Sequence, residues 1–175
     1  MPDISKMSIK QLSAFVSSHL QGDGISVVLV GGACVTIYSN NNYQTTDLDF
    51  VQRYDTKRKD LSASLTKLGF TEKNRYFEHP DTLYFLEFPA GPISVGDEAI
   101  HEFSEVETEF GTLLLLTATD ICKDRLAAFY HWRDEQSLTQ AINIASENNV
   151  DLENIKKWSE TEGMLAKFDR FRSAL

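Results

Sequence analysis

Residues 27–51 constrain the fold more than any other part of the chain. They read VVLVGGACVTIYSNNNYQTTDLDFV: a short apolar run, a glycine pair, a stretch that can form a helix, and a second apolar run that carries two aspartates. Short apolar runs bounded by glycine and polar residues are typical of buried strands. The segment therefore predicts a strand, a turn, a helix and a second strand, which is the start of an α/β sheet with helices packed on it.

The second of these strands carries Asp47 and Asp49. Successive side chains of a strand point to opposite faces, so Leu48 and Phe50 can be buried while both carboxylates converge on the other face. Two convergent carboxylates can hold a metal ion. The alternative is that both acids simply line the solvent face of an exposed strand.

Gly31 and Gly32 end the first strand and open the following helix. Glycine lacks a Cβ, and the first N–H groups of a helix have no partner within the helix, so a phosphate can approach closely there. A glycine pair after a strand also occurs as a plain tight turn or a close helix contact. Next to two acids, however, the pair favours nucleotide chemistry.

The rest of the chain divides into a region of short strands and a region of helices. Helical spacing after Ser8 predicts a first helix that ends near Gly22. The expected helices that follow are 33–38 and 60–68, and the expected strands, all in one sheet, are 26–30, 46–51, 76–78, 83–88, 93–95, 103–109 and 112–116. Beyond residue 117 the period is helical, with helices at 118–132, 135–147, 152–159 and 164–171. We therefore expect an α/β domain over residues 1–117 and a helical region over residues 118–175 packed on it.

Composition excludes several classes of protein. The net charge of −9 argues against broad binding to nucleic acid. No apolar stretch is long enough to cross a bilayer and no signal sequence is present, so we expect a cytoplasmic protein without a membrane partner. Cys34 and Cys122 lack metal-ligand spacing and are expected to be reduced and buried. The scattered histidines indicate neither a zinc site nor a catalytic imidazole.

Taken together, the glycine pair, the spacer that begins with Ala33 and the DLDF strand resemble the signature of the nucleotidyltransferase superfamily that includes DNA polymerase beta. Within it the chain is most similar to small bacterial abortive-infection proteins, the nucleotidyltransferase-like toxins of type IV toxin-antitoxin pairs. Those proteins often have a serine at the position of Ala33, so this chain lacks one hydroxyl at the expected phosphate turn. The resemblance is specific over residues 27–51 and loose beyond them.

The resemblance implies a mixed sheet flanked by helices, with a C-terminal helical appendix. It also implies transfer of a nucleoside monophosphate from an NTP to a hydroxyl of a tRNA, a protein or a small molecule. Mg²⁺ would be held by Asp47 and Asp49, and Gly31 and Gly32 would contact the triphosphate. Glu87, which interrupts the apolar run LYFLEF, is the expected third acid, although related proteins more often have aspartate there. A cognate antitoxin is a possible partner.

The helix at 118–132 carries two basic residues of interest. Arg125 falls within an apolar arc, where it needs an anion, either a structural carboxylate or a substrate phosphate. Lys123 falls on the opposite, polar side, which is ordinarily solvated. Both are candidate phosphate contacts. The alternative to an enzyme is a non-catalytic module that keeps the fold and binds a nucleotide or a protein.

Overall fold

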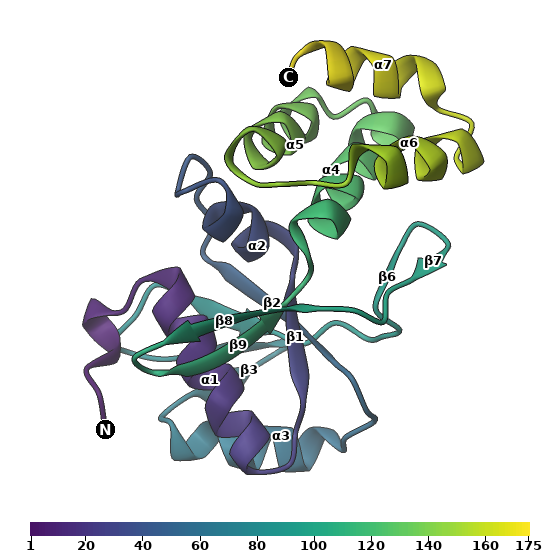
Figure 1. Ribbon diagram of the computed structural model, residues 1–175. Coiled ribbons are helices and arrows are strands. Elements are labelled where there is room, and N and C mark those ends of the chain that lie inside the picture. The colour runs from purple at the N-terminus through teal and green to yellow at the C-terminus, as the bar shows by residue number, and fades with distance from the viewer.

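The computed structural model describes residues 1–175, and its central element is a seven-stranded mixed sheet (Figure 1). The strand order is β3–β4–β5–β2–β1–β9–β8. These strands span Thr71–Lys73 (β3), Tyr76–Glu78 (β4), Phe85–Glu87 (β5), Asp47–Gln52 (β2), Val27–Val30 (β1), Gly111–Leu115 (β9) and Ser104–Thr108 (β8). β1 runs antiparallel to β2 and parallel to β9, and β2 runs parallel to β5. The α/β class and the mixed sheet expected from the sequence are confirmed.

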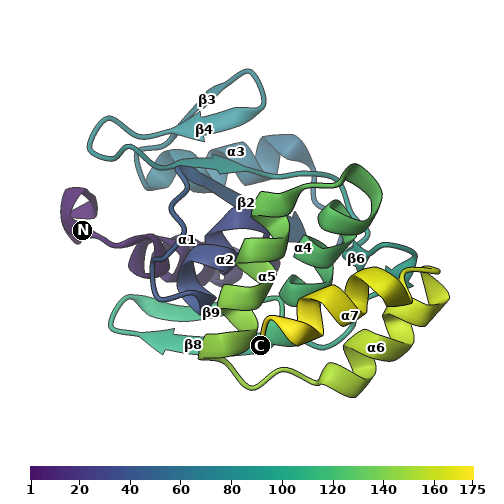
Figure 2. The same ribbon diagram turned by 90° about the horizontal axis from the view of Figure 1, so that it is seen from above.

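Helices cover both sides of this sheet. In Figure 1, α1 (Ile9–Gly22) and α3 (Arg58–Lys67) lie below the sheet, and α2 (Gly31–Tyr38) lies above it. The C-terminal helices also lie above and are seen face-on in Figure 2: α4 (Ala118–Trp132), α5 (Glu135–Glu147), α6 (Leu152–Thr161) and α7 (Leu165–Ser173). A short 3₁₀ helix, η1 (Ile4–Lys6), precedes α1.

Side-chain caps explain where several helices begin. Ser8 accepts a hydrogen bond from the backbone N–H of Gln11, and the Gln11 side chain accepts one from the backbone N–H of Ser8 at 2.9 Å. This reciprocal capping box satisfies two N–H groups that the helix itself leaves unpaired. Thr117 caps α4 and Asp151 caps α6 in the same general way. Asp120 lies three residues after the cap of α4, where its negative charge suits the helix dipole.

One hydrophobic core joins the sheet and the C-terminal helices. It contains Leu12 of α1, Leu48 of β2 and Phe171 of α7 within a single cluster of buried side chains. Cys34 and Cys122 are free and buried in this core, as expected. The division of the chain after residue 117 remains a prediction. No helix is both long enough and apolar enough to span a bilayer.

One expectation for the strand region was wrong. The segment near 93–95 does not extend the main sheet: β6 (Ser94–Val95) pairs with β7 (Glu98–Ala99) in a separate hairpin, called here the β6–β7 hairpin. α2 begins at Gly31, two residues before the expected range of 33–38, and the glycine pair opens this helix as expected. β8 and β9, which match the expected strands at 103–109 and 112–116, form an antiparallel hairpin.

Candidate functional site

The two aspartates lie on one face of β2. Asp47 and Asp49 are partly exposed, whereas Leu48 and Phe50 between and beyond them are fully buried. This alternation is the one that the sequence predicts, because the apolar side chains of the strand enter the core on the other face. Both carboxylates therefore project from the same side of the sheet.

Asp49 lies directly against the glycine turn. It is the register partner of Val30, the last residue of β1, and its Oδ2 lies 2.7 Å from the position that a Cβ on Gly31 would occupy. Gly31 has a φ of +66°, which glycine adopts without strain. A side chain at this position would clash with the carboxylate unless Asp49 moved.

The same turn begins α2, and its first N–H groups are free of a side-chain cap. Val30 is the N-cap residue and makes no capping hydrogen bond through its side chain. Uncapped N–H groups and the positive end of the helix dipole favour an anion at this place. The site thus combines an uncapped helix N-terminus with a pair of acids beside it.

Glu87 joins the acids from the neighbouring strand. It lies on β5 in register with Asp49, and the two strands run parallel. Its Oε1 is 3.1 Å from Nε of Arg75, a largely exposed residue between β3 and β4. The sequence predicts that Glu87 lies near Asp47 and Asp49, but it does not indicate a contact with Arg75. That contact arises because β4 pairs with β5, which brings Arg75 close to Glu87.

Burial and the two neighbouring acids make Asp49 costly to ionise. Burial, followed by the negative charges of Glu87 and Asp47, raises the pKa of Asp49 from its ordinary value of 3.8 to about 6. Arg125 and Arg75 oppose this shift. A carboxylate in such surroundings gains free energy when a cation arrives, because the cation neutralises the charge that burial penalises.

The chemistry of these donors fits Mg²⁺. Carboxylate oxygens are the ligands that Mg²⁺ prefers, and one or two of them are commonly completed by phosphate oxygens and water. No group of three Asp, Glu, His or Cys side chains lies close enough together to hold a metal ion without further ligands. The arrangement therefore fits an ion that arrives together with substrate phosphates and is held by Asp47 and Asp49.

The two basic candidates on α4 lie in different places. Nε of Arg125 donates to Oδ2 of Asp124 at 2.9 Å, and its charge also lowers the pKa of Asp49. Lys123 is buried, and its Nζ donates to Oε2 of Glu98 at 3.0 Å. None of its hydrogen bonds or ion pairs involves the acids on β2 and β5. The expectation that the Lys123 side of α4 is solvated was wrong, because the β6–β7 hairpin covers it.

An open cavity of about 900 Å³ adjoins Asp47. Asp47 forms part of its wall, together with Thr45, Asp81 and Tyr84. This cavity is large enough for a nucleotide or for an acceptor group beside one of the two aspartates.

Comparison with solved structures shows that the fold is nucleotidyltransferase-like. A crystal structure of an antigenic nucleotidyltransferase-like protein from Paracoccidioides brasiliensis matches with a TM-score of 0.60 and 15% identity, over 78% of this chain and 74% of that one.

Two structures of the antibiotic-resistance factor ANT(2'')-Ia also match. Its solution structure has a TM-score of 0.49 and 15% identity, over 99% of this chain and 96% of that one. Its crystal structure with adenylyl-2''-tobramycin has a TM-score of 0.49 and 13% identity, over 93% and 97%. No protein-family model and no curated protein matches the chain. The match with a TM-score of 0.60 confirms the fold expected from the sequence, and the resemblance to toxin-like proteins stays a prediction.

Proposed function

We propose that this protein is a Mg²⁺-dependent nucleotidyltransferase that moves a nucleoside monophosphate from an NTP to a hydroxyl acceptor. The observation that carries the proposal is the closeness of the Asp49 carboxylate to the glycine turn, where a Cβ on Gly31 would lie 2.7 Å from Oδ2 of Asp49. A phosphate held at the turn would share a cation with Asp47 and Asp49. The nucleotidyltransferase-like fold supports the same reading.

In this proposal each residue has a defined part. The N–H groups at Gly31 and Gly32 bind the triphosphate. Asp47 and Asp49 would hold the Mg²⁺ ion, which would neutralise negative charge on the phosphates. The acceptor oxygen forms a bond to the α-phosphorus, the bond from that phosphorus to the bridging oxygen breaks, and pyrophosphate leaves. Glu87 accepts the hydroxyl proton once its ion pair with Arg75 has opened.

The acceptor belongs to one of three classes: a tRNA, a protein hydroxyl or a small molecule. The cavity beside Asp47 has the volume for a nucleoside or a hydroxyl-bearing side chain. A toxin-like role would add a cognate antitoxin as partner, and a cytoplasmic location agrees with each of these acceptors.

Transfer of label from α-³²P-labelled NTPs tests the proposal. The protein is incubated with Mg²⁺, each NTP in turn, and cell extract separated into RNA, protein and metabolites. We expect label in one fraction with the wild type and at least a hundredfold less with Asp49→Asn. Glu105→Gln, an exposed change on β8, serves as the matched control and should keep full labelling. Equal labelling by wild type and Asp49→Asn would contradict the proposal.

The second candidate is a non-catalytic module that binds a nucleotide or a protein. Two observations favour it: Ala33 replaces the serine of related proteins, and Glu87 is already paired with Arg75. This candidate predicts that nucleotide binds and that no label is transferred to any fraction. Binding that survives in Asp49→Asn would favour it further.

A further inference from the structure

Arg75, on the turn between β3 and β4, is exposed and at the same time held in place. Its side chain is 71% exposed, but its Nε pairs with Glu87 at 3.1 Å, and its Nη2 donates a hydrogen bond to the hydroxyl of Tyr76. The guanidinium group also lies 4.8 Å from the centre of the Tyr76 ring. Both N–H bonds of Nη1 and one of Nη2 remain without a partner in the protein. Arg75 therefore offers an oriented, positively charged group to a ligand from solvent.

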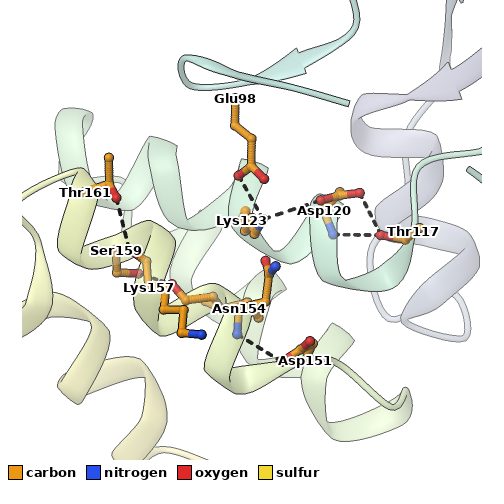
Figure 3. Close-up of polar contacts among 10 residues, drawn as sticks. Glu98, Thr117, Asp120, Lys123, Asp151, Asn154, Lys157, Ser159 and Thr161 are labelled. Carbon is orange, nitrogen blue, oxygen red and sulfur yellow. Dashed lines mark hydrogen bonds and ion pairs between the residues drawn. The ribbon is translucent and has the colours of Figure 1, made fainter. Parts of the chain in front are cut away.

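The two basic residues of α4 are less free to bind a ligand. Lys123 is buried and pairs with Glu98 at 3.0 Å and with Asp120 at 3.7 Å (Figure 3). Arg125 directs its Nε and Nη2 to the neighbouring Asp124. Both positive charges are thus already matched by carboxylates within the protein.

The strand register puts Arg75 on the side of the acids that lies away from the glycine turn. Val30, the last residue before the turn, is in register with Asp49, which is in register with Glu87. Glu87 is in turn in register with Tyr76, on which Arg75 is stacked. Neighbouring strands are about 4.8 Å apart, so this row across β1, β2, β5 and β4 is roughly 14 Å long. The acids lie in the middle of the row, with the glycine turn at one end and Arg75 at the other.

The transfer reaction proposed above needs its two substrates at opposite ends of this row. In such a displacement the attacking oxygen and the leaving group lie in line on opposite sides of the phosphorus. A triphosphate held at Gly31 and Gly32 puts the leaving pyrophosphate on the β1 side. The acceptor hydroxyl therefore approaches from the β4 side, past Glu87 and beside Arg75.

A guanidinium group at this place favours an acceptor that carries a phosphate. The planar fork of arginine binds phosphate through two parallel hydrogen bonds, and its charge repels a cationic acceptor. A phosphate on Arg75 also competes with Glu87 for the guanidinium group. The Glu87 carboxylate is then free to accept the hydroxyl proton, so binding of the acceptor is coupled to release of the base.

The surroundings of Arg75 suit a single phosphate better than a polyanion. Lys73, which is in register with Tyr76, already pairs with Glu78 at 3.4 Å. The wall of the adjoining cavity contains Asp47 and Asp81 and no basic residue. Binding of RNA depends on several Lys or Arg side chains along its backbone, and this chain has a net charge of −9. A small molecule with one phosphate therefore fits better than an RNA.

We propose that the acceptor is a small phosphate monoester with a free hydroxyl group, such as a sugar phosphate, and that Arg75 binds its phosphate. This inference rests on the proposed function, because it names the acceptor of that reaction. The hydroxyl oxygen of the acceptor forms the new bond to the α-phosphorus, its proton passes to Glu87, and pyrophosphate leaves. Tyr76 holds Arg75 in the orientation that the phosphate needs.

Removal of phosphate from the acceptor tests the proposal on the full chain. The metabolite fraction of cell extract is treated with alkaline phosphatase, the phosphatase is removed, and labelling from α-³²P-labelled NTPs is compared with that of untreated metabolites. We expect label in the untreated metabolites and about tenfold less after treatment. Label that survives the treatment, or label only in RNA or protein, would overturn this proposal and leave the proposed function standing. No label in any fraction would overturn both.

Variants of Arg75 separate acceptor binding from nucleotide binding. Arg75→Gln should raise the KM for the acceptor fraction about tenfold and change the KM for the NTP less than twofold. Arg75→Lys keeps the charge and should restore part of the acceptor affinity. Arg170→Gln, which removes a remote arginine paired with Glu135, is the control and should change neither value. A rise in the KM for the NTP instead, or equal effects of Arg75→Gln and Arg170→Gln, would overturn the proposal.

The Nε–H signal of Arg75 in a ¹H–¹⁵N spectrum reports binding without turnover. The probe is glycerol 3-phosphate, a phosphate monoester with free hydroxyls, and glycerol is the phosphate-free control. Loss of the Arg75 signal in Arg75→Lys assigns it. We expect glycerol 3-phosphate to shift the signal, because the guanidinium group exchanges Glu87 for phosphate, and glycerol to leave it in place. A signal that stays unmoved with glycerol 3-phosphate, or that moves equally with glycerol, would overturn the proposal.

Discussion

The raised pKa of Asp49 makes a quantitative prediction about stability and pH. An acid whose pKa is higher in the folded protein than in the unfolded chain contributes its full stability below the unfolded value and loses it as pH rises through the folded value. For Asp49 these values are 3.8 and about 6. At about 1.4 kcal/mol for each pH unit, the difference amounts to roughly 3 kcal/mol. Because the side chain is partly exposed, we expect about 1–3 kcal/mol.

The assay is urea denaturation of wild type and Asp49→Asn at several values between pH 4 and pH 7.5. The free energy of unfolding of the variant, relative to the wild type, should rise by about 1–3 kcal/mol across this range, since asparagine has no charge to bury. Asp55→Asn, at an exposed position outside the site, controls for the loss of one negative charge from an acidic chain. A difference that stays constant from pH 4 to pH 7.5 would refute the reasoning that burial and neighbouring acids act on Asp49.

Three further predictions follow from contacts in and around the site. Gly31→Ala should lower the free energy of unfolding by about 1–3 kcal/mol, because the residue has a positive φ and a Cβ there would clash with Asp49. Gly22→Ala has open space around it and should raise the free energy of unfolding by up to about 1 kcal/mol. Urea denaturation of both variants checks this prediction, and equal effects of the two changes would contradict it. Arg75→Gln should tighten Mn²⁺ binding severalfold, because it frees Glu87 from its ion pair. The control Arg170→Gln breaks a remote ion pair with Glu135 and should leave Mn²⁺ binding unchanged. Calorimetry that finds unchanged or weaker binding in Arg75→Gln would be evidence against a role of Glu87 in the metal site. Mg²⁺ at pH 7.5 should raise the melting temperature of the wild type and leave that of Asp47→Asn/Asp49→Asn unchanged, and an equal rise in both would place the ion elsewhere.

The parts of the fold that the sequence predicts well are those with long periodic patterns. Helices α1, α4 and α5 begin and end within a residue or two of their expected positions, because each combines an amphipathic repeat with a capping side chain. The alternation of Asp47 and Asp49 with buried neighbours was equally readable, since one strand contains the whole pattern.

What the sequence does not reveal is which short segments pair. Strands of two or three residues, such as β3 and β7, have too little pattern to be recognised. β6 pairs with β7 apart from the main sheet and lies against α4, which the local sequence does not indicate. The burial of Lys123 follows from that hairpin and not from the helix on which it lies. The ion pair between Arg75 and Glu87 likewise exists only because two strands are neighbours in the sheet.

Calorimetric titration with Mg²⁺ and a non-hydrolysable NTP tests the central claim most directly. The claim is that Asp47 and Asp49 hold the ion against a phosphate at Gly31 and Gly32. We predict that the wild type and Glu105→Gln/Asp169→Asn bind the nucleotide only when Mg²⁺ is present. Asp47→Asn/Asp49→Asn should bind at least tenfold more weakly. Equal binding heats in the wild type and in Asp47→Asn/Asp49→Asn, or no heat in either, would contradict the claim.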